Sequence, residues 1–245
     1  MKAIIRCMHV SVLLIGLCCV AAADPPTGEG WTPLFNGKDL TGWRLTGGGA
    51  AQNVPADSDW KVIDGVIDYN AKDGKSIRTE KSYGDFVLYI EWRMKTAKEL
   101  YGKETDDAGK PIRHAPDSGV FLRGTGRGQI NIWLSPMGSG EMWGLRHDKK
   151  IPEDVREKRY RPITRADKPL GEWNTFEVTM KGKHVTVLLN GTKVIDAPLP
   201  EDFPDTGSIV LQHHGKYDAA KKRWSPAAAT VQFRNITIKE LPADK

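Results

Sequence analysis

The sequence predicts an all-β protein, built as a sandwich of two sheets or a jelly roll. Apolar and polar residues alternate over many short stretches, which is the pattern of half-buried strands. Gly, Asn and Asp separate these stretches, as they do in hairpin connections. Helical periodicity is scarce, so the alternation governs the prediction.

Two hairpins are the clearest elements. His184–Leu189 and Thr192–Ile195 are joined by Asn-Gly, a pair that accepts the positive φ of a two-residue turn. Trp60–Ile63 and Val66–Tyr69 flank Asp-Gly in the same way. Further strands are predicted at Asp85–Met94, Ser118–Arg123, Gln129–Ser135, Thr175–Lys181, Ser208–His214 and Thr230–Ile238.

Two long segments do not have the pattern of strands. Thr96–Asp117 and Leu145–Leu170 are polar, charged and interrupted by prolines. We expect both to be loops, and loops of this length in a compact domain are usually functional or mobile. The second is either a solvated loop or the rim of a binding face.

The first residues predict export. Lys2 and Arg6 precede the apolar run Val10–Val20, and Ala21–Ala23 offers small residues for cleavage, as in a secretory leader. We therefore expect a leader at residues 1–23, a single domain at 24–245, and a secreted or periplasmic protein. The alternative is a permanent N-terminal anchor. No later stretch of sequence is long and apolar enough to span a membrane.

The positions of the cysteines and the net charge exclude some classes of function. Cys7, Cys18 and Cys19 all lie in the expected leader, so the mature chain has no thiol for a disulfide, catalysis or a metal. The net charge of +5 includes Lys2 and Arg6, and removal of the leader would remove both of these positive charges. The remaining excess is small and no nucleic-acid motif is present, so we expect no nucleic-acid partner.

Strand alternation sorts the polar residues onto a common face. In Phe86–Met94 the even-numbered residues are apolar, so Glu91 should point away from the core. The same rule turns Arg123, Gln129 and Asn131 outward. The complete outward set is Tyr89, Glu91, Arg93, Gly119, Phe121, Arg123, Gln129, Asn131, Trp133, Gln212 and His214.

If these faces belong to one curved sheet, they form a groove that suits a sugar. Aromatic rings stack on the C–H faces of a pyranose, while amides, carboxylates and guanidinium bind its hydroxyls. Each residue singly could belong to an ordinary solvated strand face. The row of Gln129, Asn131 and Trp133 fits that alternative least well, because amides and an exposed Trp rarely alternate toward solvent.

Several motifs then resemble one family. They are Gly30–Trp43 (GWTPLFNGKDLTGW), Asp117–Arg123 (DSGVFLR), Gly171–Glu177 (GEWNTFE), Leu188–Gly191 (LLNG), Leu211–Gly215 (LQHHG) and Phe233–Ile236 (FRNI). Together they are similar to the 3-keto-disaccharide hydrolase family over about Gly30 to Leu241. The resemblance implies a concanavalin A-like jelly roll whose concave sheet binds saccharide. It also implies a 3-keto-glucoside 1,2-lyase and 3-keto-2-hydroxyglucal hydratase, with hydrolysis as the net reaction.

The sequence departs from the family pattern at one place. Many members carry Glu and Gln where this chain has Gln129 and Asn131, and the GSGE run Gly138–Glu141 follows. This combination is typical of a distinct branch of the family.

The same residues argue against an ordinary glycosidase. Such an enzyme needs two carboxylates across the scissile bond, and the Glu-x-Asp-x-x-Glu run of related glucanases is missing. A ketone at C3 acidifies the proton on C2, so a single base can remove it while the substituent on C1 leaves. The enolate then needs hydrogen-bond donors, a cation or a metal.

These requirements select the candidate residues. His214 is the first candidate for the base or proton shuttle, although a structural hydrogen bond is an equal alternative. Glu141 is the second, and Arg123 is the candidate oxyanion stabiliser. Glu91 could orient substrate or hold a cation. The candidate substrate-binding residues are Glu91, Gln129, Asn131, Trp133, Trp143 and Gln212.

Three further points stay open at this stage. A divalent metal ion could be held by Glu141, His214 and Asp117, because carboxylate and imidazole suit hard or borderline metals. A lectin-like module of the same fold, which binds saccharide without chemistry, is the alternative function. The sequence does not indicate an oligomeric state.

Overall fold

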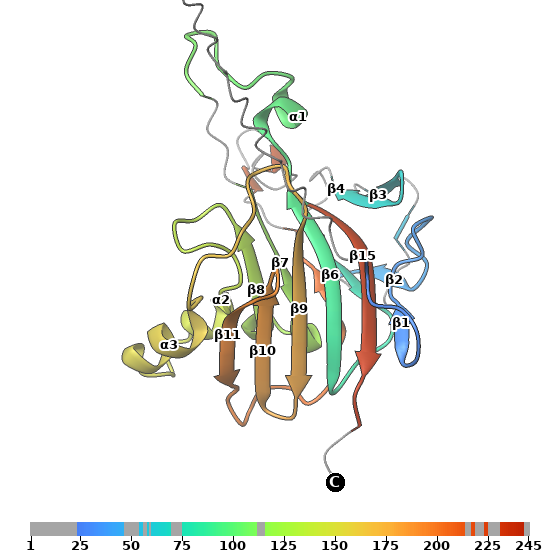
Figure 1. Cartoon of the computed structure of the whole chain (residues 1–245), viewed down its shortest axis with the longest axis vertical. Helices are drawn as coiled ribbons and strands as arrows, with labels where there is room; N and C mark the ends of the chain where they lie inside the picture. Colours follow the sequence, from blue (N-terminus) through green and yellow to red (C-terminus); the bar gives the residue numbers. More distant parts are fainter. Residues whose placement is uncertain are drawn as a thin grey trace, which may run out of the picture.

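The protein is a jelly-roll sandwich of two antiparallel sheets packed face to face (Figure 1). The structure is a computed structural model and describes residues 24–46, 54–55, 58, 60–69, 75–111, 116–213, 217–218, 223–224 and 231–242. Figure 1 looks onto the large sheet, and the smaller sheet lies behind it. The all-β prediction is confirmed.

The large sheet has eight strands in the order β11-β10-β9-β6-β15-β4-β3, and β1 pairs with β15. Its strands are β1 (Trp31–Pro33), β3 (Trp60–Ile63), β4 (Val66–Tyr69), β6 (Phe86–Met94), β9 (Asn174–Lys181), β10 (His184–Leu189), β11 (Thr192–Pro198) and β15 (Val231–Glu240). Both predicted hairpins are present, with Asn190 and Asp64 at positive φ in their turns.

The small sheet has five strands in the order β2-β5-β12-β7-β8. They are β2 (Trp43–Leu45), β5 (Ile77–Thr79), β7 (Asp117–Phe121), β8 (Gln129–Trp133) and β12 (Val210–Leu211). A separate pair joins β13 (Tyr217–Asp218) to β14 (Arg223–Trp224). Three strands are shorter than predicted: β7 ends at Phe121, before Arg123, β8 ends at Trp133, and β12 covers only Val210–Leu211.

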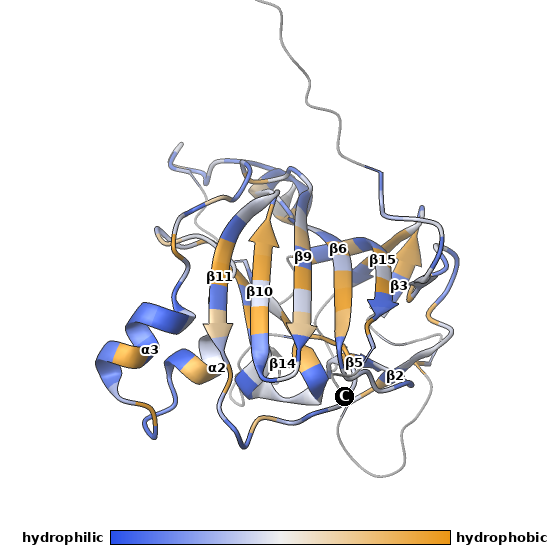
Figure 2. Ribbon diagram, turned by 60° about the horizontal axis from the view of Figure 1, so that its bottom comes forward, coloured by the Kyte–Doolittle hydropathy of each residue, from blue (hydrophilic) through white to orange (hydrophobic). Residues whose placement is uncertain are grey.

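The core lies between the two sheets, as the alternation predicted. Leu88, Ile90 and Trp92 of β6 are fully buried, and so are Ile130 and the other inward residues of the small sheet. Figure 2 shows hydrophobic colour along β6 and β10. Buried aromatic and branched side chains from both sheets meet at close-packed density, and this burial fixes which face of each strand is left for function.

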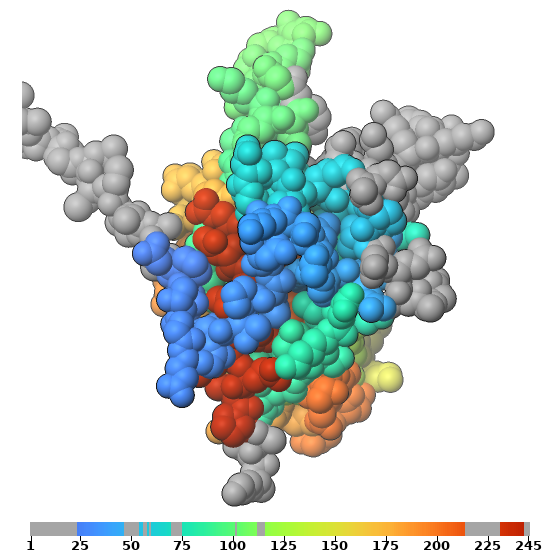
Figure 3. All heavy atoms as spheres, turned by 90° about the vertical axis from the view of Figure 1, so that its right-hand side faces the viewer, coloured from blue at the N-terminus to red at the C-terminus, as the bar shows by residue number. Residues whose placement is uncertain are grey.

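The N-terminal part of the described chain closes the edge of the sandwich. Trp31 lies opposite Lys239 in the pairing of β1 with β15, and the backbone N–H of Leu34 donates to the carbonyl of Ile236 at 2.8 Å. Figure 3 shows this blue segment packed against the red C-terminal strand. The GWTPLFNG and FRNI motifs therefore meet in the fold, although they lie at opposite ends of the sequence.

The segments predicted as loops contain helices, so that prediction is wrong in part. The helices are α1 (Ala97–Tyr101), α2 (Trp143–Arg146) and α3 (Glu153–Tyr160), with 3-10 turns η1 (Leu122–Gly124) and η2 (Gly126–Gly128). Thr96 and Glu99 form a capping box that starts α1. Acidic residues occupy the first turn of α3 and basic residues its last, which favours the helix dipole.

None of the helices that the structure describes is long and apolar enough to cross a membrane. The expected leader at residues 1–23 lies outside the described residues, so its cleavage stays a prediction.

Candidate functional site

Three amide side chains meet on the outer face of the small sheet. Gln129 Nε2 donates to Asn131 Oδ1 at 2.9 Å and to Gln212 Oε1 at 3.0 Å. We call Gln129, Asn131 and Gln212 the amide cluster. Gln129 and Asn131 are 6% and 2% exposed, so these amides are packed in place instead of moving freely in water. The alternation of β8 correctly predicted that they share a face.

Gly119 forms the floor beneath this cluster. It lies opposite Asn131 in the pairing of β7 with β8. A Cβ at this glycine would lie 2.9 Å from Gln129 Cγ and 3.0 Å from Gln212 Oε1. Any other residue would displace the amides, which explains why the outward position between Asp117 and Phe121 is a glycine.

A backbone irregularity next to β8 brings a carboxylate to the cluster. Asn131 N–H donates to the carbonyl of Glu141, and Gly140 N–H donates to the carbonyl of Asn131, both at 2.8 Å. Two residues thus oppose one, as in a β-bulge, a feature that often re-aims side chains near active sites. Gly140 has φ +106°, and a Cβ there would lie 2.8 Å from Val194 Cγ2. The GSGE run therefore has a geometric reason to place Glu141 beside Asn131.

Glu141 is completely buried, and only part of it is paired. Its Oε1 accepts from Arg146 Nη1 at 2.6 Å. Its Oε2 has no hydrogen-bond partner among the residues that the structure describes. Arg146 also forms an ion pair with Glu157 of α3. Helix α2 therefore supplies the cation that holds Glu141, and α3 helps to position it. A buried carboxylate oxygen without a donor is costly, which favours a ligand or solvent donor at this point.

Asp117 is the second carboxylate of the site. It begins β7 and lies opposite Trp133 in the sheet register, on the same face as Gly119. Burial and then the negative charge of Glu141 raise the pKa of Asp117 to about 7. Two carboxylates that interact in this way cannot both ionise easily, so near neutral pH Asp117 exchanges a proton readily.

The hydrogen-bond directions leave donors for a ligand. Gln129 uses both hydrogens of its amide on the oxygens of Asn131 and Gln212. The NH2 groups of Asn131 and Gln212 therefore point away from those contacts, and neither has a partner among the described residues. A proton-exchanging carboxyl beside two amide donors can remove a proton from a ligand and stabilise the oxyanion that forms.

Two tryptophans flank the cluster. Trp133 continues the row on β8, and its indole Nε1 donates to the carbonyl of Gly138 at 3.1 Å. Trp143 begins α2, is 43% exposed and stacks on His147 with ring centroids 4.6 Å apart. Met142 pairs with Ile130 in an antiparallel β-bridge. Trp143 follows Met142 and Gln129 precedes Ile130, so Trp143 lies at the level of Gln129. The exposed indole is therefore a candidate stacking surface at the rim.

Comparisons with known proteins identify the family and the fold of the chain. The model of the 3-keto-alpha-glucoside-1,2-lyase-like domain matches residues 30–239. The chain belongs to this family. Among curated proteins, none matches it.

Solved structures show the same fold. A protein from Parabacteroides distasonis ATCC 8503 assigned as a glycosyl hydrolase has a TM-score of 0.57 and 23% identity, over 90% of this chain and 100% of that one. A second structure with the same description from that organism has a TM-score of 0.54 and 25% identity, over 87% of this chain and 84% of that one. This family member is therefore a carbohydrate-active protein with a jelly-roll fold.

The structure corrects the placement of Glu91. This residue lies on β6, in the large sheet, whereas the amide cluster lies on the small one. It is 2% exposed and accepts from Arg234 Nε at 2.6 Å and Asn235 Nδ2 at 3.0 Å. Alternation gave the correct face of β6 but could not tell which sheet contains the strand. Glu91 therefore holds the FRNI motif in place, and its predicted substrate contact is wrong.

The placement of Arg123 is also corrected. Its side chain is 1% exposed and forms an ion pair with Asp85 at 2.9 Å. It also donates to the carbonyls of Gly84, Gly182 and Pro204 at 2.9 to 3.0 Å. The residue sits at φ +49° inside η1, so the strand alternation no longer applies to it. Arg123 fastens three loops, and the prediction of an oxyanion-stabilising role is wrong.

The remaining predictions concern His214 and a metal. His214 lies outside the described residues, so its role stays a prediction. Among the residues that the structure describes, no group of three or more His, Cys, Asp or Glu side chains could hold a metal ion. The predicted metal set of Glu141, His214 and Asp117 includes a residue outside the described part, so it also stays a prediction.

Sequence reasoning undervalued Asp117 and missed Arg146. Asp117 was named only as a possible metal ligand, although its position two residues before Gly119 already placed it on the outward face. Arg146 lies in a segment read as a loop, so no periodicity pointed to it. Only the helices α2 and α3 bring its guanidinium to Glu141.

Proposed function

We propose that this protein cleaves 3-keto-glycosides by elimination across C1 and C2 followed by hydration. The observation that carries the proposal is the pairing of a proton-exchanging Asp117 with the amide donors of Asn131 and Gln212 on one face of the small sheet. Membership of the 3-keto-alpha-glucoside-1,2-lyase-like family supports the substrate class.

The state of Glu141 argues against an ordinary double displacement. A retaining glycosidase needs one carboxylate free to attack C1 and another to act as acid. Glu141 is 0% exposed, and its Oε1 is held by Arg146 at 2.6 Å. It is therefore poorly placed as a nucleophile. Its charge instead raises the pKa of Asp117, which favours a mechanism with one base.

In the proposed elimination, Asp117 takes the proton from C2 of the sugar. The electron pair of the C–H bond moves toward C3 and gives an enolate oxygen there. Asn131 and Gln212 donate hydrogen bonds to that oxygen. The enolate then collapses, the bond from C1 to the leaving oxygen breaks, and Asp117 passes the proton that it took from C2 to that oxygen, so an alcohol departs and an enone remains.

Hydration reverses the sequence with water. The carboxylate of Asp117 takes a proton from water while the water oxygen adds to C1 and the enolate forms again, and Asp117 then gives that proton to C2, so a free 3-keto sugar results. A pKa near 7 suits both directions, because the same group must accept and return a proton at one pH.

We also propose that the protein acts outside the cytoplasm, as a secreted or periplasmic enzyme. The basic, apolar and small-residue regions of residues 1–23 support this proposal. N-terminal sequencing of the exported protein, expressed from its full-length sequence, should begin near Asp24. A protein that keeps Met1 and stays with the cells would contradict it.

The test of function uses the purified protein with methyl 3-keto-glucoside and with unoxidised methyl glucoside. We expect transient enone absorbance and methanol release from the keto sugar alone. Return of the keto sugar unchanged after saturable binding would show the lectin-like alternative. Equal cleavage of the unoxidised sugar would show an ordinary glycosidase and contradict the elimination.

A further inference from the structure

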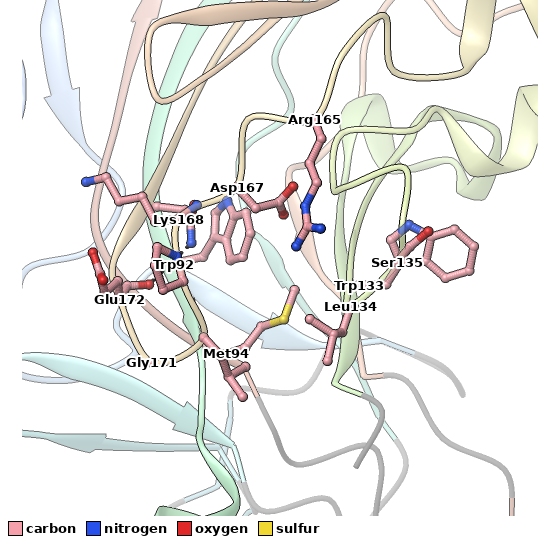
Figure 4. A pocket seen from close by; sticks show the side chains of 13 residues that line it. Trp92, Met94, Trp133, Leu134, Ser135, Arg165, Asp167, Lys168, Gly171 and Glu172 are labelled. Atoms are coloured by element: carbon pink, nitrogen blue, oxygen red, sulfur yellow. Dashed lines mark hydrogen bonds between the residues drawn. The ribbon is translucent and has the colours of Figure 1, made fainter. Parts of the chain in front are cut away.

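A hollow lies at one end of the sandwich, where the two sheets meet a loop. It has a volume of about 220 Å³ and is lined by the ends of β6 and β8, by Arg165, by residues 167–172 and by Asn174. We call it the end pocket (Figure 4). The lining residues used below are Trp92, Met94, Trp133, Leu134, Arg165, Asp167 and Leu170.

The walls of the end pocket are mostly apolar. Met94 and Trp133 contribute to it from the large and the small sheet. Leu134 and Leu170 also line it, although they are 50% and 36% exposed. Two large, partly exposed aliphatic side chains that line one hollow are an arrangement that apolar ligands exploit.

One side of the pocket is charged and fixed. The side chains of Arg165 and Asp167 point into the same part of it (Figure 4). Both carboxylate oxygens of Asp167 accept from the backbone N–H of Ser139, at 3.1 and 3.0 Å. A Cβ at Gly138 would lie 2.4 Å from Asp167 Oδ2, so the GSGE run packs directly against this wall.

The pocket also contains an unused buried donor. Trp92 is 0% exposed, and its indole Nε1 has no hydrogen-bond partner among the residues that the structure describes. The other two buried indoles, those of Trp43 and Trp60, donate to backbone carbonyls at 2.7 and 2.8 Å. A buried donor without a partner is rare, and an acceptor atom on a ligand or water in the pocket would satisfy it.

The end pocket adjoins the amide cluster along β8. Asn131 belongs to the cluster and Trp133 lines the pocket, so the two lie about 7 Å apart along the strand. Trp133 also faces Asp117 across the sheet register. On the neighbouring segment, Ser139 contacts the pocket wall, and the backbone carbonyl of Glu141, two residues later, accepts from the N–H of Asn131 in the cluster. Two neighbouring parts of one substrate can therefore occupy the cluster and the pocket together.

We propose that the end pocket binds the leaving group of the substrate, and that it selects an apolar ring. This inference rests on the proposed function, because it assigns the other half of the same glycoside. A volume of about 220 Å³ exceeds that of a cavity of about 150 Å³ that holds one benzene, so the pocket has room for one ring. The leucines and Trp133 contact the faces of that ring, and Trp92 donates to an acceptor on it.

The test compares two substrates that differ only in the leaving group. They are 4-nitrophenyl 3-keto-glucoside and methyl 3-keto-glucoside, each measured for kcat/KM and, by titration calorimetry, for Kd. Leu134→Ser with Leu170→Ser removes the apolar rim at exposed positions. Ile163→Ser is the matched control, because Ile163 is 66% exposed in the same region but does not line the pocket.

We expect the double variant to lower the ratio of aryl to methyl kcat/KM about tenfold, the effect of losing one or two apolar contacts in a binding pocket. The control should keep the ratio. An unchanged ratio in the double variant, with both substrates cleaved, would overturn the pocket assignment alone. Absence of cleavage together with an aryl preference in Kd that the double variant loses would overturn the proposed function and uphold the pocket. Neither cleavage nor binding would overturn both.

Discussion

Replacing Asp117 by Asn should stabilise the protein and abolish its activity. An aspartate in the unfolded chain ionises near its ordinary pKa of about 3.9, whereas the folded protein raises the pKa of Asp117 to about 7. Between these values the folded state retains a proton that the unfolded state has lost. The free energy of unfolding therefore falls as pH rises from about 4 to about 7, and it stays level above that.

The size of the effect follows from this difference. A shift of about three units corresponds to roughly 4 kcal/mol at 1.36 kcal/mol per unit, and coupling to Glu141 reduces the share that belongs to Asp117. Asn cannot ionise, so the variant does not lose this free energy of unfolding as the pH rises. We expect Asp117→Asn to be more stable than the native protein by roughly 1 to 4 kcal/mol at pH 8, and by little at pH 4.

The same change should lower turnover of a 3-keto-glucoside by about 10² to 10⁴, the usual contribution of a positioned base. Urea unfolding at the two pH values gives the stability, and enone formation gives the rate. Asp107→Asn is the control, since that side chain is 98% exposed and its loss should change neither quantity much. A stability difference that is equal at both pH values, or an active Asp117→Asn protein, would refute the reasoning.

Three further variants test other parts of the site. Gly119→Ala places a methyl group against Gln129 and Gln212, so we expect sugar affinity to fall about tenfold or more by calorimetry; Gly126→Ala, with nothing within 4 Å of its added carbon, should bind normally. Glu141→Gln removes the charge that raises the pKa of Asp117, so the acid limb of the kcat/KM profile should move to lower pH; a limb that moves upward or stays would contradict the coupling. Arg123→Ala leaves Asp85 unpaired and three loop carbonyls without a donor, and should cost about 3 to 5 kcal/mol in urea unfolding; a fully stable but inactive variant would restore a catalytic role for this arginine.

The sequence alone predicted both hairpins and the strands β6, β8, β9 and β15, and it predicted the faces of β6 and β8. Side chains in a strand alternate between the two faces of the sheet, so the pattern of polar and apolar residues predicts the face on which each residue lies. This was enough to predict that Gln129 and Asn131 share an outward face with Gly119, and the distances between the amides confirm it. The ordered motifs also indicated the family before any fold was known.

The tertiary structure decided which outward faces belong together. Glu91 and Asn131 both point away from the core, but their strands lie in different sheets, and no local pattern records that choice. The alternation of β7 does not extend to Arg123, because a residue at positive φ breaks the strand. The contact of Arg146 with Glu141, and the raised pKa of Asp117, depend on burial and charge between segments distant from one another. Periodicity is a property of a few neighbouring residues, whereas desolvation and pairing depend on the whole folded chain.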